Sequence, residues 1–261
     1  MRTVRTLIWI SLCAALVVGA GPASAERLVV SLSNHRVMVT SSFAGEELVL
    51  FGSVEQDRAS VLRRGGYDLV VTVRGPRQSV RARHKERVLG IWVNAESRVF
   101  VNVPSYLAVL SNKPVNEITN PETLRREQIG IENVLLPQKI GVDIGDVVRN
   151  DPFRTAFIRL KKEHGLYRDD PKAITFLTPT LFRAAIPLPA AVPVGSYTIE
   201  IKLFADGALV ARAGSALEIV KVGFEQFVAN AARDHGLLYG LATVALALLT
   251  GWIGAVVFRR D

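Results

Sequence analysis

Hydrophobic segments at both ends of this chain of 261 residues constrain everything that lies between them. Residues 1–25 have the parts of a cleavable secretory signal: Arg2 and Arg5, an apolar stretch from Thr6 to Ala20, and the small residues Ala23-Ser24-Ala25. The apolar stretch has about fifteen residues, whereas a spanning helix needs roughly 18–20. We therefore expect cleavage before Glu26 rather than an uncleaved anchor.

The second segment is the uncharged run from Leu237 to Phe258. As a helix it is roughly 33 Å long, enough to cross a hydrocarbon core of about 30 Å. Arg259 and Arg260 follow it directly, and positive charge favours the cytoplasmic side. The sequence therefore predicts a single-pass protein of the bacterial inner membrane. Its ectodomain would lie in the periplasm, its span at 237–258 and its cytoplasmic tail at 259–261.

Cysteine usage limits the chemistry of the exported part. The chain has one cysteine, Cys13, and it lies within the predicted signal. The mature chain would have neither disulfide bonds nor thiol chemistry. Its stability must come from a packed core, for which about 210 residues are sufficient.

Short β-branched runs separated by turn residues predict a mainly β ectodomain. Asp206-Gly207 is typical of a tight hairpin turn, and Pro193 to Tyr197 resembles the entry to a late immunoglobulin-type strand. We expect an Ig-like β-sandwich, formed either as one sandwich or as two small ones. The expected strands are Leu28–Val30, Val37–Val39, Leu48–Phe51, Leu69–Val71, Val88–Val93, Val99–Val103, Ile174–Leu177, Leu181–Ile186, Tyr197–Phe204, Leu209–Arg212 and Ala216–Val220.

A helical insertion interrupts the predicted strands. Pro121 to Leu135 and Pro152 to His164 have helical composition, each with proline in the first turn. The resulting division is a signal at 1–25, sandwich strands at 26–116, a helical insertion at 117–170, returning strands at 171–222, a juxtamembrane helix at 223–236, a transmembrane helix at 237–258 and a tail at 259–261.

Small residues follow one face of the predicted transmembrane helix. Their spacing of three and four would let a second helix approach closely, although small residues are also common in helices that only anchor. We hypothesise that this face packs against a membrane-embedded partner, identical or different. The residues are Gly240, Thr243, Ala247, Gly251 and Gly254.

Positive charge is concentrated in one segment of the ectodomain. Nine Lys or Arg residues lie between Arg58 and Arg87, against two acids, Asp68 and Glu86. Strand alternation places Arg81, Arg83, Lys85 and Arg87 on one face. Such a row attracts anions such as lipid headgroups, acidic protein or a small oxyanion. The same row also suits an edge strand that is protected from pairing by its charge.

Trp92 follows this row within the string Gly90 to Asn94, and two explanations apply to it. A core tryptophan of a sandwich is the ordinary explanation. As an alternative, Trp92 belongs with the basic row to an anion- or partner-binding surface.

The sequence has no motif of a known catalytic or metal site. It lacks the nucleophile elbow, the phosphate-binding glycine loop and the zinc-binding histidine pair. Histidines 35, 84, 164 and 235 are scattered, and Asp143 and Asp146 lie in a glycine-containing segment that we expect to be a loop. We expect a non-enzyme without metal or cofactor, and nucleic acid is a poor partner for an exported domain.

Four strings along the chain resemble a known family: GIWVN at Gly90–Asn94, VPSYLAVLS at Val103–Ser111, FLTPTLFRAAIPLP at Phe176–Pro189 and VGSYTIEIKLFADG at Val194–Gly207. Together with the signal and the C-terminal span, they resemble the alphaproteobacterial putative transmembrane protein family, whose function is uncharacterised. The resemblance implies an exported single-span protein. It also implies an accessory role beside a permease of the sulfite-exporter type.

Two main hypotheses follow, with an unrecognised enzyme as a third. In the first, the chain is a non-catalytic accessory or assembly module that docks on an integral-membrane partner. In the second, it is a periplasmic anion-binding or sensing module that uses the row from Arg81 to Arg87. A three-residue tail leaves no room for a cytoplasmic output domain, which favours the accessory hypothesis.

Overall fold

The computed structural model describes residues 26–55, 66–140, 143–146, 150–223, 228 and 231–257. The signal predicted at 1–25 and the tail predicted at 259–261 lie outside the described residues, as does much of the predicted juxtamembrane helix. Residues 231–234 are helical, and the backbone N–H of His235 donates to the carbonyl of Ala231 at 3.0 Å.

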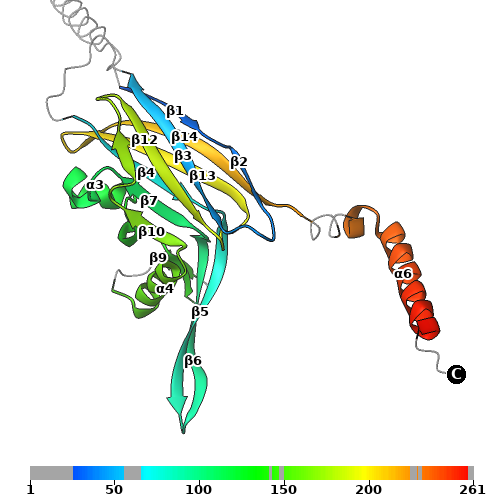
Figure 1. The fold of residues 1–261 in the computed structure, drawn as a ribbon. Coiled ribbons are helices and arrows are strands. Elements are labelled where there is room, and N and C mark those ends of the chain that lie inside the picture. Colours follow the sequence, from blue (N-terminus) through cyan, green and yellow to red (C-terminus); the bar gives the residue numbers. More distant parts are fainter. Residues whose placement is uncertain are drawn as a thin grey trace, which may run out of the picture.

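Two sheets pack face to face to form the body of the β-rich region (Figure 1). The first is antiparallel throughout. Its strand order is β1 (Arg27–Leu32), β3 (Gly45–Glu55), β12 (Leu181–Pro189) and β11 (Ile174–Phe176). The second sheet has the order β10 (Tyr167–Asp170), β7 (Leu107–Ser111), β4 (Asp68–Arg74), β13 (Gly195–Ala205), β14 (Ala208–Lys221) and β2 (Arg36–Val39). Its two outermost pairings, β10 with β7 and β14 with β2, are parallel.

The strand order corresponds to that of an immunoglobulin sandwich. If β1, β3, β4, β11, β12, β13 and β14 are lettered A to G in chain order, one sheet reads A-B-E-D and the other contains C-F-G. Tyr197, near the start of the F-like strand β13, donates its hydroxyl to the carbonyl of Pro193 at 2.6 Å, as in a tyrosine corner. The prediction of a mainly β fold followed by a C-terminal apolar helix is confirmed.

The core between the two sheets comes from the alternating residues of their strands. Leu48, Leu50 and Phe182 of one sheet and Val71 and Ile201 of the other are almost completely buried. Asp206 and Gly207 form the tight β13–β14 turn, both with positive φ, as the sequence predicted. Strand β14 is continuous where two separate strands were expected.

A second core lies on the other face of the six-stranded sheet, against the insertion. The insertion contains α2 (Val115–Ile118), α3 (Pro121–Arg126), the 3₁₀ turn η1 (Ile131–Asn133), β8 (Pro137–Ile140), β9 (Asp143–Asp146) and α4 (Pro152–Glu163). Asp151 caps α4 by accepting a hydrogen bond from the Arg154 N–H at 2.9 Å, and Pro152 occupies the first turn. Phe157 of α4 packs on Phe100 with the ring centroids 4.6 Å apart. The segment with Asp143 and Asp146 forms strand β9 rather than the expected loop, because it pairs with β8.

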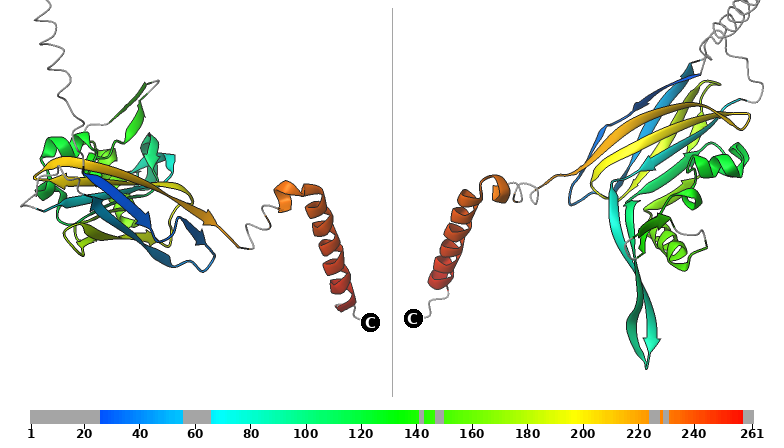
Figure 2. Two further views of the ribbon diagram at one scale, coloured as in Figure 1. Left: turned by 90° about the horizontal axis from the view of Figure 1, so that it is seen from above. Right: turned by 180° about the vertical axis from the view of Figure 1, so that it is seen from behind.

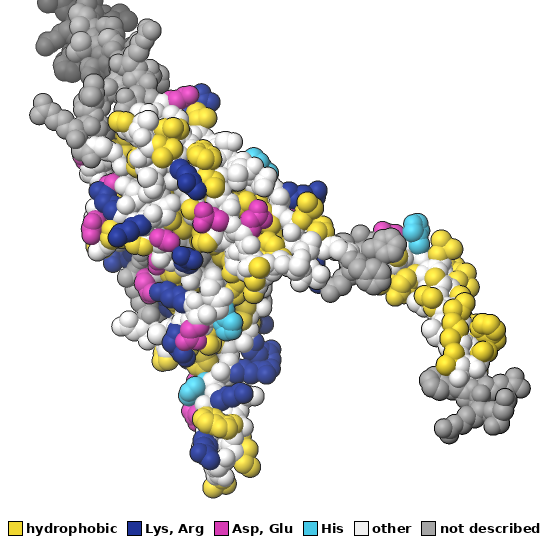
Figure 3. All heavy atoms as spheres, viewed as in Figure 1, with side chains coloured by type: hydrophobic (Ala, Val, Ile, Leu, Met, Phe, Trp, Pro, Cys, Tyr) yellow, Lys and Arg dark blue, Asp and Glu magenta, His cyan; other side chains and the backbone are white. Residues whose placement is uncertain are grey.

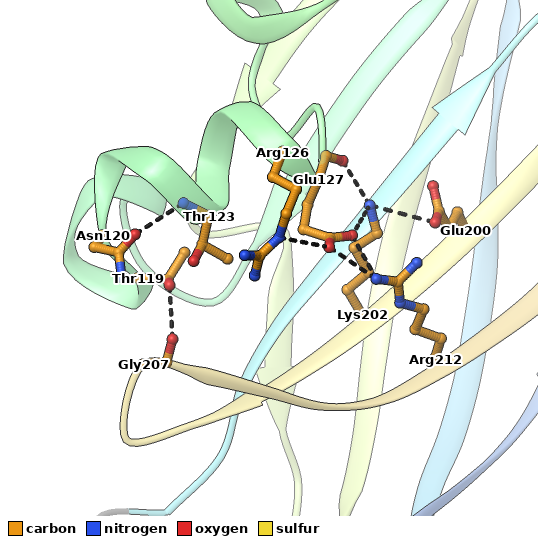
Figure 4. A network of polar contacts seen from close by, with 9 residues as sticks. All are labelled: Thr119, Asn120, Thr123, Arg126, Glu127, Glu200, Lys202, Gly207 and Arg212. Carbon is orange, nitrogen blue, oxygen red and sulfur yellow. Dashed lines mark hydrogen bonds and ion pairs between the residues drawn. The ribbon is translucent and has the colours of Figure 1, made fainter.

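An ion-pair network fastens the insertion to the sandwich (Figure 4). Lys202 of β13 is 2% exposed, and its Nζ donates to the Glu127 carbonyl at 2.6 Å and lies 3.4 Å from Glu127 Oε2. Arg212 of β14 contacts the same carboxylate at 2.7 Å. Burial raises the pKa of Glu200, but hydrogen bonding to Arg74 and the charge of Lys202 outweigh burial and leave this pKa below its usual value.

A third sheet contains a long hairpin of β5 (Arg77–Val88) and β6 (Ile91–Pro104), followed by β8 and β9. Figures 1 and 2 show this hairpin projecting away from the sandwich. Here the sequence prediction was wrong: Val88–Val93 is not one strand of the sandwich but the end of the hairpin. The chain reverses at Leu89 and Gly90, which both have positive φ.

The last described element is α6 (Gly236–Val257), an apolar helix of 22 residues. It has the length and composition of a membrane span, and none of its residues is buried against the rest of the described chain. The helix therefore presents its whole surface to the surroundings, as an isolated span in lipid would.

Candidate functional site

The hairpin of β5 and β6, residues 77–104, is called here the hairpin arm. Its root is held by the second core, where Phe100 and Val103 are buried. Its outer part is different, because every residue from Arg83 to Ser97 is exposed. A two-stranded ribbon is marginally stable by itself in water, so the exposed length of this arm suggests a surface made for contact.

The four residues Arg81, Arg83, Lys85 and Arg87, called here the basic row, lie on one face of the arm. Their cross-strand neighbours on that face are Val99, Ser97, Asn94 and Trp92, none of which is acidic. Among the residues that the structure describes, no carboxylate forms an ion pair with any of the four. The four residues share one strand face, as the alternation of the sequence predicted. On that face the row presents four positive charges without an ion-pair partner among the described residues. Figure 3 shows Lys and Arg side chains gathered along the arm.

The end of the arm, called here the apolar tip, consists of hydrophobic side chains that water reaches. Leu89 is 98% exposed, Ile91 69% and Trp92 66%, with Val88 at 48%. The explanation of Trp92 as a core tryptophan is therefore wrong, because the turn at Leu89-Gly90 carries it beyond both cores. Gly90 inside an otherwise apolar run was the sequence signal that could have located this turn.

The opposite face of the arm borders an apolar groove against α4. The groove has a volume of about 690 Å³, and its floor includes Val80, Ala82, Phe153 and Phe157. Its rim carries charge of both signs, from Arg81, Arg83, Arg98, Lys161, Glu86 and Glu96, together with His84 and His164. Arg98 lies 4.7 Å from the centre of the Phe153 ring and pairs with Asp151 at 2.8 Å. These contacts fix one wall of the groove.

Lys161 is a half-buried cation of the groove. Its Nζ donates to the Ser105 carbonyl at 3.2 Å and lies 5.6 Å from the centre of the Phe157 ring. Burial lowers the pKa of Lys161, because its charged form loses hydration. Since the ammonium group is held by this carbonyl and by two aromatic rings, Lys161 supports the floor of the groove.

The arrangement of the basic row bears on the kind of anion that it can bind. Alternate residues on a strand are about 6.6 Å apart, so the row spans roughly 20 Å. A small oxyanion held by converging Arg forks would meet at most two of these side chains. The row therefore fits an extended anionic surface better than one small ion.

The arm and the connection to α6 leave the sandwich at the same end. Strand β4 runs to Arg74, which pairs with Thr198, and after Gly75 and Pro76 the chain enters β5. Gly195, whose Cα hydrogen faces the Pro76 ring, pairs with Ile219 near the end of β14. In Figure 1, β14 accordingly leaves beside the root of the arm.

The small-residue face predicted for the transmembrane helix lies on α6 without a partner in the described chain. Apart from the neighbouring backbone of α6 itself, no atom of the described residues lies within 4 Å of the space that a Cβ would occupy at Gly240, Gly251 or Gly254. Thr243 satisfies its hydroxyl within the helix, by donating to the Gly240 carbonyl at 2.8 Å. With Ala247 between them, these residues leave a smooth face against which another helix can pack.

Histidine and acidic side chains do not form a metal site in the part of the chain that the structure describes. His84 lies 3.5 Å from Glu86, and Nδ1 of His164 lies 2.6 Å from the Leu160 carbonyl. Both histidines thus have local partners at the groove rim. His35 and His235 lie away from this groove.

Comparison with known proteins gives one family. The model of the family described as "Putative transmembrane protein (Alph_Pro_TM)" matches residues 27–260, which is nearly the whole chain after the predicted signal. A search of curated proteins finds no match.

Proposed function

The chain belongs to this family of transmembrane proteins, and from this premise we propose that it is a non-catalytic accessory module of the bacterial inner membrane. In this proposal α6 holds the ectodomain on the periplasmic side, where it docks on an integral-membrane protein. The observation that carries the proposal is the groove between α4 and the hairpin arm. It is an apolar surface at the same end of the sandwich as the connection to the membrane.

The chemistry of the groove suits a segment of another protein. Its floor is aromatic and aliphatic, and Leu160 at its edge is 45% exposed. The rim offers both cations and carboxylates, which give register and specificity to a bound segment. An amphipathic segment that places its apolar side on Phe153 and Phe157 would find a polar partner of either sign at the rim.

The small-residue face of α6 supplies a second contact within the membrane. A partner helix lying on Gly240, Ala247 and Gly251 would approach the backbone closely, which favours packing in lipid. Two contacts on one partner reinforce each other, because the first raises the local concentration for the second. The resemblance of the sequence points to a permease of the sulfite-exporter type as the class of partner.

Site-specific crosslinking tests the proposal. Leu160 of the full chain is replaced by a photoreactive phenylalanine derivative. The variant is produced in its native host, and crosslinking is carried out in the membranes of those cells. We expect a covalent adduct with an integral-membrane protein. Leu177 is the matched control, since it is an exposed leucine (54%) beyond β11, at the opposite end of the sandwich. Equal adducts from both positions, or none from Leu160, would contradict the proposal.

A further inference from the structure

We propose that the hairpin arm makes a second contact with the bilayer that holds α6. Leu89, Ile91 and Trp92 of the apolar tip enter the headgroup region, and Arg83, Lys85 and Arg87 bind the phosphates of anionic lipids. The proposal rests on membrane anchoring by α6 and is independent of any protein partner.

The composition of the tip matches the membrane interface. Three large apolar side chains, 98%, 69% and 66% exposed, lie within four consecutive positions around the turn. Contact with water is unfavourable for such a cluster, and soluble surfaces rarely retain one without a use. Tryptophan is particularly favoured at the interface, where its ring meets lipid and its N–H meets water.

Charge follows directly behind the apolar residues. Arg87 is the cross-strand neighbour of Trp92, and Lys85 and Arg83 follow on the same face. The carboxylates of the outer arm, Glu86 and Glu96, lie at alternate positions on the other face. One face can thus approach a negative surface without repulsion. Each Lys or Arg near an anionic bilayer strengthens binding roughly fivefold.

The geometry of the sandwich brings the tip to the bilayer. The arm leaves beside the end of β14, and only residues 222–235 separate β14 from α6. These 14 residues span about 21 Å as a helix and at most roughly 50 Å when extended. From its root at Arg77 to Leu89 the arm reaches roughly 40 Å, of which the exposed part from Arg83 is about half. This distance lies within the reach of the connection, so the tip and the start of α6 can meet the same membrane surface.

Depth-dependent quenching tests this contact in the purified full chain. A Leu89→Cys variant carries a fluorophore sensitive to its environment and is reconstituted into vesicles that contain nitroxide-labelled lipid. Cys13 lies in the predicted signal, so the mature chain brings no other cysteine. We expect strong quenching in vesicles that contain phosphatidylglycerol. A Leu177→Cys control should stay unquenched. Equal quenching at the two positions would overturn the proposal.

Charge reversal tests the basic row separately. Arg83→Glu with Lys85→Glu should weaken binding of the tip to anionic vesicles by at least roughly 25-fold, because each lost positive charge costs about fivefold and the two added carboxylates are repelled as well. The matched control is Arg125→Glu with Lys172→Glu, a pair of exposed cations outside the arm, which should leave the quenching unchanged. Quenching that is the same in neutral and anionic vesicles would overturn the assignment of the basic row to lipid phosphates.

Discussion

Arg87 and Trp92 occupy paired positions on β5 and β6, so a guanidinium and an indole share the outer face of the hairpin arm. Neither side chain is buried by the sandwich. Their position joins the basic row to the apolar tip and makes the arm an amphipathic element. The arm thereby differs from the strands of the sandwich, whose apolar residues meet one another in a core.

The position of Trp92 gives a test by stability. Trp92→Ala should change the free energy of unfolding by less than about 0.5 kcal/mol, because surface substitutions have small effects. Phe100→Ala, at the buried root of the same hairpin, should cost about 3–5 kcal/mol. Thermal melting of the full chain in detergent compares the two. A large loss for Trp92→Ala would show that the tryptophan is packed in a core.

The buried pair of Lys202 and Glu127 should be essential for attaching the insertion. Lys202→Met removes the buried partner of the enclosed Glu127 carboxylate, which keeps its ion pairs with Arg212 and Arg126, so the loss should be about 1–3 kcal/mol. We expect the melting temperature to fall by roughly 5 °C. Arg159→Met, which breaks the exposed pair with Glu163, should have almost no effect. Equal melting temperatures for the two variants would show that the ion-pair network does not stabilise the fold.

Buried tyrosines should make the stability of the β-rich region sensitive to alkaline pH. Burial raises the pKa of Tyr106, Tyr167 and Tyr197 above the ordinary value near 10. Below pH 10 the folded and the unfolded chain both keep the protons of the tyrosine hydroxyls, so the three tyrosines contribute fully to stability. Above pH 10 the unfolded state loses protons first, and each tyrosine costs about 1.4 kcal/mol per pH unit. Denaturant unfolding at pH 9 to 11 measures this loss of stability. In Tyr167→Phe the free energy of unfolding should fall less steeply with pH. If Tyr167→Phe leaves the dependence of the unfolding free energy on pH unchanged, the burial of the Tyr167 hydroxyl is contradicted.

The small-residue face of α6 should decide whether a partner is retained. Ala247→Leu with Gly251→Leu places two bulky side chains where a helix would approach, so we expect loss of a co-purified membrane protein. Ala242→Leu with Ala245→Leu puts the same bulk on the opposite face and should retain it. Circular dichroism checks that the ectodomain stays folded in both. Retention of the partner by both variants would show that this face is not used.

Local signals in the sequence were sufficient for several elements. Pro152 located the start of α4, Asp206-Gly207 located a hairpin turn, and the uncharged run before Arg259 predicted the apolar helix. These features depend on neighbouring residues, so no knowledge of tertiary structure was needed.

Features that depend on distant residues were missed. Val88 to Val93 has the composition of a strand, and Gly90 is the local sign of a turn within it. No local signal shows that this turn ends a hairpin that projects from the sandwich. Lys202 and Glu127 are 75 positions apart, so their pairing has no local signal. The groove also needs β5 beside α4, more than 60 residues later in the chain. The alternation of side chains along the strand correctly predicted that the four residues of the basic row share one face. Only the tertiary structure shows that this face lies outside the sandwich.

The central claim is that α6 holds the ectodomain at the outer surface of the cytoplasmic membrane. Protease added to spheroplasts tests it most directly, with the full chain followed by a tag after Asp261. The account predicts that the ectodomain is digested from outside while a small tagged fragment containing α6 stays protected. A protected ectodomain, digested only after the cytoplasmic membrane is opened, would contradict the orientation and with it the proposed contacts with a partner and with lipid.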